Sequence, residues 1–252
     1  MIVVRNIHKS FAGKTVLQNA SLQVNEGEIL AIIGRSGSGK SVLMKHMVGL
    51  LKPDSGQVLV DGLDINTVSY RELQKVRQNF GVLFQGGALF DSMNSFENVA
   101  FPLRTFGKLS EIEIQERVLK CLEMVELPDV GTKLPSELSG GMQKRVALAR
   151  AISMNPRYIM YDEPTSGLDP ETSNTIDALI NNLADRLNVT SVVVTHDMHS
   201  VLSIADRAAF IHNGTIWWVG TIDELHTCTD PVLIGFVKAN EYQIGPQHAA
   251  AR

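Results

Sequence analysis

The chain has 252 residues, of which 44% are hydrophobic and 20% charged, and its formal net charge is −4. This is the composition of a globular protein, and no run of Lys and Arg marks a nucleic-acid partner. No apolar run approaches the roughly 20 residues that span a bilayer, and the first residues lack the apolar core of a signal peptide. The two cysteines, Cys121 and Cys228, are predicted to be free thiols in a cytosolic protein.

The first third of the chain predicts an antiparallel sheet that leads into a buried strand. Short strands are expected over residues 2–11, 16–17 and 20–24, and the apolar run 29–33 follows. A glycine-rich loop and a helix to about residue 50 come next, then a turn and a strand over 57–61. A helix over 69–77 and a buried strand over 80–84 lead to Gln85.

The glycine-rich loop, placed between a strand and a helix, has the pattern of a phosphate-binding P-loop. Glycines let backbone N–H groups surround phosphate oxygens at a helix N-terminus. Lys40 would reach the β- and γ-phosphates, and Ser41 would offer its hydroxyl to Mg²⁺. The sequence therefore predicts a nucleotide-binding protein, with contacts from Gly34, Arg35, Ser36, Gly37, Ser38, Gly39, Lys40, Ser41 and Val42.

Residues 86–153 are predicted to form an all-helical insertion, although the part up to Arg104 shows little regularity. Ser110 and Glu113 have the spacing of a capping box, which predicts a helix to about residue 126. Ser139 is then expected to cap a second helix, over residues 140–153.

The α/β pattern resumes after the insertion. Strands are expected over residues 158–161 and 190–194, and helices over 171–187 and 198–206. Asn213-Gly214 predicts a hairpin, and two short helices are expected near residues 221–224 and from 230 to about 238.

Polar side chains follow several of the predicted buried strands. In parallel sheets ligands bind outside the carboxyl ends of strands, so the P-loop, Gln85, Asp162-Glu163 and His196 are expected to converge on one nucleotide. Asp162 would hold Mg²⁺ through water, and Glu163 would polarise the water that attacks the γ-phosphate.

A second glycine-rich helix start, over residues 138–143, predicts another anion site. One nucleotide does not need two such sites on a single chain. Standing alone, this stretch would be interpreted as a capped helix with a permissive glycine pair.

Together these motifs resemble the ATP-binding subunits of ABC transporters over about residues 2–238. The P-loop, a Q-loop glutamine at Gln85, a signature at Ser139, Gly140 and Gly141, Walker B at Asp162-Glu163, a D-loop ending in Asp169 and a switch histidine at His196 occur in the ABC order. Phe11 fits the adenine-stacking aromatic of that family, and Val16 is assigned to the same pocket.

The resemblance implies an α/β fold of the P-loop ABC ATPase type, with a RecA-like core, an antiparallel β subdomain and a helical subdomain. It implies a single domain over residues 1–240, comprising a catalytic lobe (1–85 and 154–240) and a helical lobe (86–153), then a tail (241–252). Two copies would pair head to tail, so that the P-loop of one and the signature of the other hold each ATP with Mg²⁺. Glu163, His196, Lys40 and Gln85 are the expected catalytic residues, and Ser41, Gln85 and Asp162 the expected metal ligands.

The stretch after Gln85 resembles the ATPases of Mla-type phospholipid transport systems, which work with MCE-domain proteins. Gly-Ala-Leu-Phe at 87–90 carries this resemblance, and residues 193–197 and 201–206 also look like that group. Glu-Asn-Val at 97–99 is shared with generic importers, and Asn94-Ser95 departs from the Thr-Val common in the Mla group. It implies a multi-spanning permease that docks over residues 86–104 and holds the chain on the cytoplasmic face of the inner membrane. Phe96 and Phe101 are expected to belong to the core of the helical lobe.

Three alternatives stay open from the sequence. The chain could serve another importer, such as one for amino acids. It could instead be a soluble ABC protein that acts as an assembly factor, or a kinase that uses the P-loop, although a kinase leaves Ser139–Gly141 unexplained. The direction of transport, the exact lipid and the role of the tail do not follow from the sequence.

Overall fold

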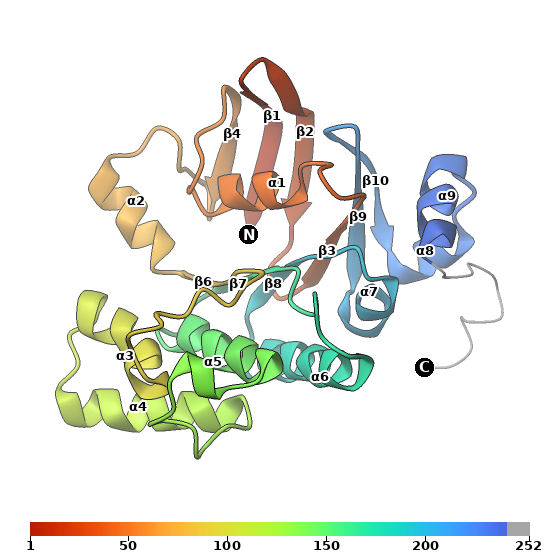
Figure 1. Cartoon of the computed structure of the whole chain (residues 1–252). Coiled ribbons are helices and arrows are strands. Elements are labelled where there is room, and N and C mark those ends of the chain that lie inside the picture. The colour runs from red at the N-terminus through yellow and green to blue at the C-terminus, as the bar shows by residue number, and fades with distance from the viewer. Residues whose placement is uncertain (241–252) are drawn as a thin grey trace. The chain divides into compact units, whose positions relative to one another are not determined.

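The computed structural model describes residues 1–240, so the predicted tail 241–252 lies outside the described residues. The described chain forms two compact units. The first comprises Met1–Val76 and the chain from Thr190 onward, and the second is Arg77–Val189. Figure 1 labels the elements of both.

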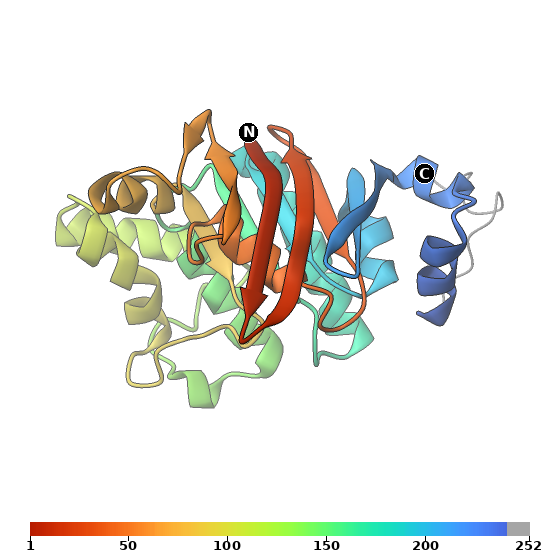
Figure 2. The same ribbon diagram turned by 90° about the horizontal axis from the view of Figure 1, so that it is seen from above.

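An antiparallel sheet occupies the N-terminal part of the first unit. Its strand order is β2-β1-β4-β5, formed by β1 (Ile2–Phe11), β2 (Lys14–Val24), β4 (Ser55–Val60) and β5 (Leu63–Asp64). β1 and β2 are long neighbouring strands (Figure 2). The prediction of separate strands at 16–17 and 20–24 was wrong, because β2 is continuous. It accommodates Asn19 at φ 52° and pairs with β1 through shifts in register.

A second sheet in the same unit has the order β10-β9-β3-β8. β3 (Ile29–Ile33) is entirely buried and pairs in parallel with β8 (Thr190–Val194) and with β9 (Arg207–His212), as expected for an apolar run without alternation. β10 (Thr215–Thr221) is antiparallel to β9 through the predicted Asn213-Gly214 turn.

Helices accompany these strands. α1 (Lys40–Met47) follows β3, and α2 (Tyr70–Arg77) follows the antiparallel sheet. α7 (Met198–Ile204), α8 (Ile222–Thr227) and α9 (Pro231–Ala239) contribute apolar side chains to a core that includes Ala31 and Ile33 of β3 and Phe210 of β9. Because β3 is packed so closely, the loop that follows it starts from a rigid strand.

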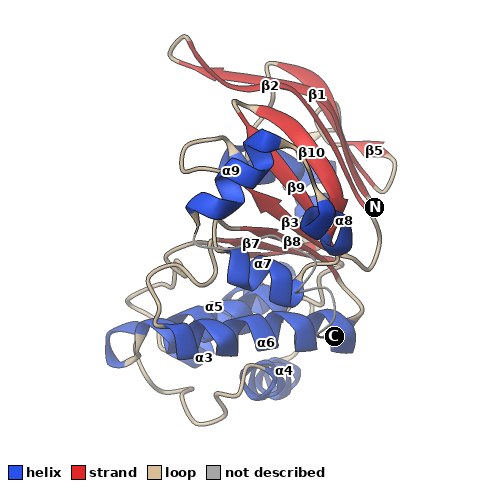
Figure 3. Cartoon of the chain, turned by 90° about the vertical axis from the view of Figure 1, so that its right-hand side faces the viewer, coloured by secondary structure: helices blue, strands red, loops and turns tan. Residues whose placement is uncertain are grey.

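The second unit combines two parallel strands, β6 (Phe80–Leu83) and β7 (Tyr158–Asp162), with several helices. These are α3 (Ser95–Phe106), α4 (Glu111–Met124), the 3₁₀ turn Pro135–Glu137, α5 (Gly140–Ile152) and α6 (Pro170–Leu187). Figure 3 shows α3, α4, α5 and α6 gathered together. The predicted helical lobe 86–153 lies within this unit.

α3 corrects the irregular structure expected before Arg104. Asn94 accepts the backbone N–H of Glu97, and the Glu97 side chain accepts the N–H of Asn94, so a full capping box starts the helix. Pro102 lies inside this helix, and because proline usually breaks a helix, the sequence did not indicate one here. Phe96 and Phe101, expected in the core, are half-buried.

The predicted α/β fold with an antiparallel β part and a helical part is confirmed. Within residues 1–240, no helix combines the length and the hydropathy that a membrane crossing requires.

Candidate functional site

The P-loop begins where β3 ends, and two of its glycines, Gly34 and Gly39, lie too close to neighbouring strands for a Cβ atom. A Cβ on Gly34 would lie 2.5 Å from the carbonyl oxygen of Ile211, and one on Gly39 would lie 2.9 Å from Leu17 Cδ2. Gly37 and Gly39 also have φ of 76° and 106°, in the region that favours glycine. The loop therefore bends sharply against β2 and β9 before α1 starts.

The N-terminus of α1 has no side-chain cap. Its N-cap residue is Gly39, whereas α3, α5 and α6 are capped by the side chains of Asn94, Ser139 and Asp169. The first N–H groups of a helix need partners and carry partial positive charge. Ser38 Oγ, nearby in the loop, is buried and has no hydrogen-bond partner among the described residues. This helix start has the character of an anion site.

Lys40 lies across the loop. Its buried Nζ donates to the carbonyl oxygens of Gly34 at 2.8 Å and of Arg35 at 3.3 Å. Ser41 and Val42 follow in the first turn of α1 and are half-buried. The positive charge of Lys40 is thus concentrated at the same helix N-terminus as the N–H groups.

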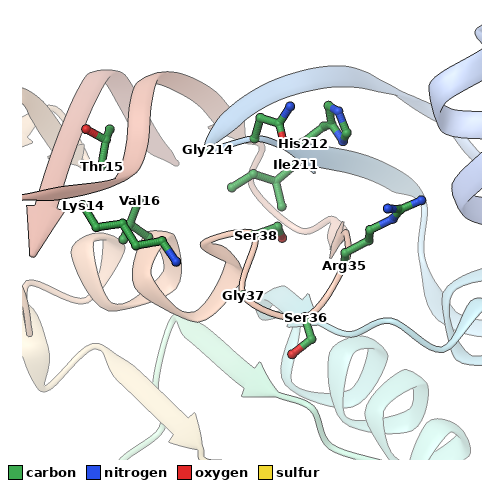
Figure 4. A pocket seen from close by; sticks show the side chains of 11 residues that line it. Lys14, Thr15, Val16, Arg35, Ser36, Gly37, Ser38, Ile211, His212 and Gly214 are labelled. Atoms are coloured by element: carbon green, nitrogen blue, oxygen red, sulfur yellow. The ribbon is translucent and has the colours of Figure 1, made fainter.

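A pocket of about 500 Å³ borders the P-loop (Figure 4). It is lined by Lys14–Val16 of β2, by Arg35–Ser38 and by Ile211–Gly214 at the β9–β10 turn. Among the predicted nucleotide contacts, Val16, Arg35, Ser36, Gly37 and Ser38 belong to this lining.

Phe11 is not part of the pocket lining, although it ends the strand that pairs with β2. Its side chain is 43% exposed, and Lys9 Nζ lies 5.4 Å from the ring centroid. The ring is therefore available for stacking from solvent, next to a cation.

His196 is in the same unit, just beyond the carboxyl end of β8. Ile32 and Val194 are partners in the β3–β8 register, and the Thr195 N–H donates to the Ile32 carbonyl oxygen at 3.2 Å. His196 and the P-loop thus follow adjacent ends of parallel strands, as the sequence predicts. The imidazole is exposed, and Asp197 caps the helix after it.

Asp162 and Glu163 lie at the carboxyl end of β7, in the second unit. Asp162 is buried, whereas Glu163 is half-buried with φ 49°, an uncommon conformation for a residue other than glycine. Lys144 of α5 donates to the carbonyl oxygens of Glu163, Pro164 and Ser166 at 3.4, 2.6 and 2.7 Å. Lys144 of α5 therefore stabilises this strained turn through hydrogen bonds.

α5 starts with the glycine pair, at an exposed end. Ser139 accepts the Met142 N–H at 3.3 Å, and Gln143 Nε2 donates to the Pro135 and Leu138 carbonyl oxygens. Gly141 is needed because a Cβ there would lie 2.4 Å from Thr172 Cγ2 of α6. Ser139 and Gly140 remain exposed at the helix N-terminus.

The remaining two predicted residues also belong to the second unit. Asp169 caps α6 and accepts hydrogen bonds from the Thr172 N–H and Oγ1, which lower the pKa of its carboxyl group. Gln85 is exposed, and its Nε2 lies 3.4 Å from Ser166 Oγ.

Each unit therefore assembles part of the predicted site. The first brings together the P-loop, Val16 and His196. The second brings Gln85 near the turn after Glu163, and the start of α5 near Asp169 through Thr172.

Sequence reasoning missed two residues that organise the stretch after Gln85. Asn98 is fully buried; its Oδ1 accepts the Phe90 N–H, and its Nδ2 donates to the Phe90, Met93 and Asn94 carbonyl oxygens. Arg150 of α5 donates to the Gly87 and Ala88 carbonyl oxygens at 2.9 and 2.8 Å. An Asn within the apolar sequence 98–101 was the available signal for the first.

Among the described residues, no group of three or more His, Cys, Asp or Glu could hold a metal ion. A site that uses substrate oxygens needs fewer protein ligands, and Mg²⁺ is usually bound in this way. The oxygen-bearing groups of Ser41, Gln85 and Asp162 are of the type that Mg²⁺ prefers.

A family model described as ABC transporter matches residues 17–166. The intermembrane phospholipid transport system ATP-binding protein MlaF of Haemophilus influenzae is 45% identical over 238 residues, covering 94% of this chain and 90% of that protein. The methionine import ATP-binding protein MetN of Carboxydothermus hydrogenoformans is 42% identical, with 89% and 67% covered. The probable ribonucleotide transport ATP-binding protein mkl of Mycobacterium leprae is 40% identical, with 97% and 70% covered.

Solved structures of ATP-binding cassettes are also similar to this chain. A dimeric post-hydrolysis state of the ATP-binding cassette MJ0796, bound to ADP and phosphate, is 35% identical with a TM-score of 0.81, covering 88% of this chain and 99% of that one. CbiO1 from Clostridium perfringens, part of the ABC transporter complex cbiONQ, is 30% identical with a TM-score of 0.83, and 94% of each chain is covered.

Proposed function

The chain belongs to the ABC transporter family as an ATP-hydrolysing subunit, and we propose that it drives phospholipid movement between membranes in an Mla-type system. The observation that carries the cargo proposal is the 45% identity to MlaF over nearly the whole length of both chains. Similarity to MetN and mkl, whose names specify other cargoes, is slightly lower.

In this proposal ATP binds at the P-loop. Two observations support a phosphate there. The first N–H groups of α1 have no side-chain cap, and the buried hydroxyl of Ser38 has no hydrogen-bond partner among the described residues. Lys40 would exchange its carbonyl partners for phosphate oxygens, and Phe11, together with Val16, would hold the adenine.

The residues for Mg²⁺ fit by the chemistry of their donors. Ser41 would contribute a hydroxyl, Gln85 an amide oxygen and Asp162 a buried carboxylate that acts through water. Bound there, the ion would neutralise charge on the phosphates during transfer.

Hydrolysis is assigned to Glu163 as general base. A carboxylate at the end of a buried strand, on a turn fixed by Lys144, can hold a water at a defined place. His196, at the end of β8, would contact the γ-phosphate. Gln85 would respond to whether the γ-phosphate is bound. His196→Ala should therefore reduce ATP turnover far more than ATP affinity, and normal turnover would reduce His196 to a structural role.

A second copy of the chain would complete each site. Ser139, Gly140 and Gly141 form a helix start that the chain's own P-loop does not require, and its first two residues are exposed. Asp169 caps the neighbouring helix. The solved relative MJ0796 is described as dimeric. Pairing head to tail would place this helix start against the γ-phosphate of the other copy.

The stretch 86–104 is proposed to receive a cytosolic helix of the permease. Phe90 is 41% exposed and packs on Phe101 at 4.7 Å between ring centroids, so an aromatic surface faces outward. Arg150 connects this stretch to α5, whose other end carries Ser139. The permease would hold the chain on the cytoplasmic face of the inner membrane, with an MCE-domain protein in the complex.

Affinity purification of the tagged chain from detergent-solubilised native membranes tests the cargo. The proposal expects a multi-spanning permease together with an MCE-domain protein. A permease with a soluble solute-binding protein would contradict the lipid cargo and indicate an importer for amino acids or another small molecule. Recovery with soluble partners alone would contradict the transporter and indicate an assembly factor.

A further inference from the structure

Lys144 is a buried cation with an unusual set of partners. It lies in the second turn of α5, only 6% exposed, on the helix that Ser139 caps. An ammonium group has three donors, and here they face the carbonyl oxygens of Pro164, Ser166 and, at a longer distance, Glu163. All three acceptors belong to one turn, between β7 and α6.

Burying the ammonium group of Lys144 is unfavourable unless its donors find partners. Burial lowers the pKa of Lys144, because the charged form loses solvent, while the nearby charge of Glu163 acts in the opposite direction. A nonpolar residue would avoid the desolvation but leave inward-facing carbonyl groups without a donor. The cation therefore fixes the path of a turn whose first residue, Glu163, has φ 49°.

The same helix is in contact with α6 through Gly141, which lies three residues before Lys144 and therefore on the same face. Gly141 packs so closely on Thr172 that a Cβ would lie 2.4 Å from Thr172 Cγ2, and Thr172 is hydrogen-bonded to Asp169. The start of α5 is thus connected to both ends of the segment 163–169, through Lys144 at one end and Thr172 at the other.

We propose that Lys144 is a positioning residue that couples the signature start of α5 to the aim of the Glu163 carboxylate. Contact of Ser139–Gly141 with the second copy's nucleotide would move α5, and the three hydrogen bonds of Lys144 would carry that movement to the turn after Asp162. Hydrolysis would then depend on closure of the pair. This inference rests on the proposed role of Glu163.

The test uses full-length Lys144→Met, whose unbranched side chain is one atom shorter than that of Lys and has no donors. The turnover number for ATP should fall about 10- to 100-fold, because a misplaced base loses part of the 10²–10⁴-fold that general base catalysis supplies. The Kd for a fluorescent ATP analogue should stay close to that of the wild type, since ATP is bound by the P-loop, whereas the melting temperature should fall because carbonyl oxygens of the turn lose their donor. Lys144→Gln, which keeps one amide donor group, should give intermediate turnover.

Lys120→Met, an exposed lysine on α4, is the matched control and should leave every quantity unchanged. Wild-type turnover in Lys144→Met, or in Lys144→Gln if the Met variant does not fold, would overturn the inference. A fall in turnover matched by an equal loss in ATP affinity would also overturn it, because it would indicate a merely structural residue.

Glu163→Gln measured in parallel separates this inference from the proposal on which it rests. Normal turnover in Glu163→Gln would refute the base assignment itself. Loss of turnover in Glu163→Gln together with wild-type behaviour of the Lys144 variants would refute only the coupling.

Discussion

Two lysines show how the same side chain takes different roles. Lys40 donates to carbonyl oxygens of its own loop, at the uncapped N-terminus of α1. Lys144 donates to carbonyl oxygens of a turn that is distant in the sequence. In the proposed function, Lys40 would exchange these partners for phosphate oxygens when a nucleotide binds. The bond of Lys144 to Pro164 is buried, and those to Glu163 and Ser166 are partly buried.

Lys40→Ala is expected to weaken ATP binding about 10- to 100-fold, because a hydrogen bond to a charged group contributes about 1.5–3 kcal/mol. Titration with a fluorescent ATP analogue measures the change. Lys45→Ala, on the same helix but in its last turn, should bind normally. Equal affinity in Lys40→Ala and the wild type would refute the P-loop assignment.

His46, also on α1, predicts a pH dependence of stability. It is fully buried, its Nδ1 lies 2.7 Å from the Val42 carbonyl oxygen, and its Nε2 has no hydrogen-bond partner among the described residues. Burial lowers the pKa of its imidazole from 6.5, the nearby Lys9 acts in the same direction, and the bond to Val42 and the charge of Asp54 oppose it. Above pH 6.5 the ring is neutral in both the folded and the unfolded state.

As the pH falls below 6.5, the unfolded state takes up the proton first, so folding stability is lost with acidification. In His46→Gln the fall in melting temperature between about pH 7 and pH 5 should be smaller than in the wild type. His199→Gln, at an exposed position in the same unit, is the control and should follow the wild type. Identical pH profiles for the His46 variant and the wild type would contradict this assignment.

At the scale of single residues, the sequence predicts groups that recur as linear motifs. The P-loop, Glu163 and His196 each lie where a strand ends, and the strands are recognisable from their apolar runs. Lys144 and Arg150 could not be predicted in the same way. Their roles come from backbone carbonyl groups that are brought to them by the fold, and no spacing along the chain encodes such partners.

At the scale of elements, close packing of β6 on α5 predicts that Gly81 cannot be replaced by a larger residue without loss of stability. A Cβ on Gly81 would lie 2.5 Å from the carbonyl oxygen of Ala151, a backbone atom that cannot rotate away. Gly81→Ala should lower the free energy of unfolding by about 1–3 kcal/mol, measured by urea denaturation. Gly131→Ala, where the nearest atom would be 3.8 Å away, is the control. Equal stability of the two variants would contradict the packing.

Most elements could be predicted, and the errors have physical causes. β3, β7 and β8 are buried apolar runs, and α4 and α6 have clear caps and apolar spacing. α3 was missed because Pro102 obscures a helix that starts from the Asn94–Glu97 capping box. β2 was divided because polar residues and Asn19 interrupt its apolar pattern, yet pairing with β1 keeps it continuous.

At the scale of the whole molecule, one chain carries two helix starts suited to anions, of which its own nucleotide needs one. In the proposed function, the uncapped start of α1 and the exposed Ser139 start of α5 would act together when two copies pair. In the proposed pairing, ATP would form part of the interface, and hydrolysis would reopen it. That cycle is what a transporter's ATPase supplies to a permease.

The most direct test is the mass in solution of the full-length Glu163→Gln variant with ATP and Mg²⁺, measured by size-exclusion chromatography with light scattering. The variant should bind ATP without hydrolysing it and form a dimer that dissociates when ADP replaces ATP. Adding Ser139→Phe should leave ATP binding intact and abolish the dimer. A Glu163→Gln chain that hydrolyses ATP normally, or that stays monomeric with ATP bound at every concentration tested, would contradict a catalytic site shared between two copies.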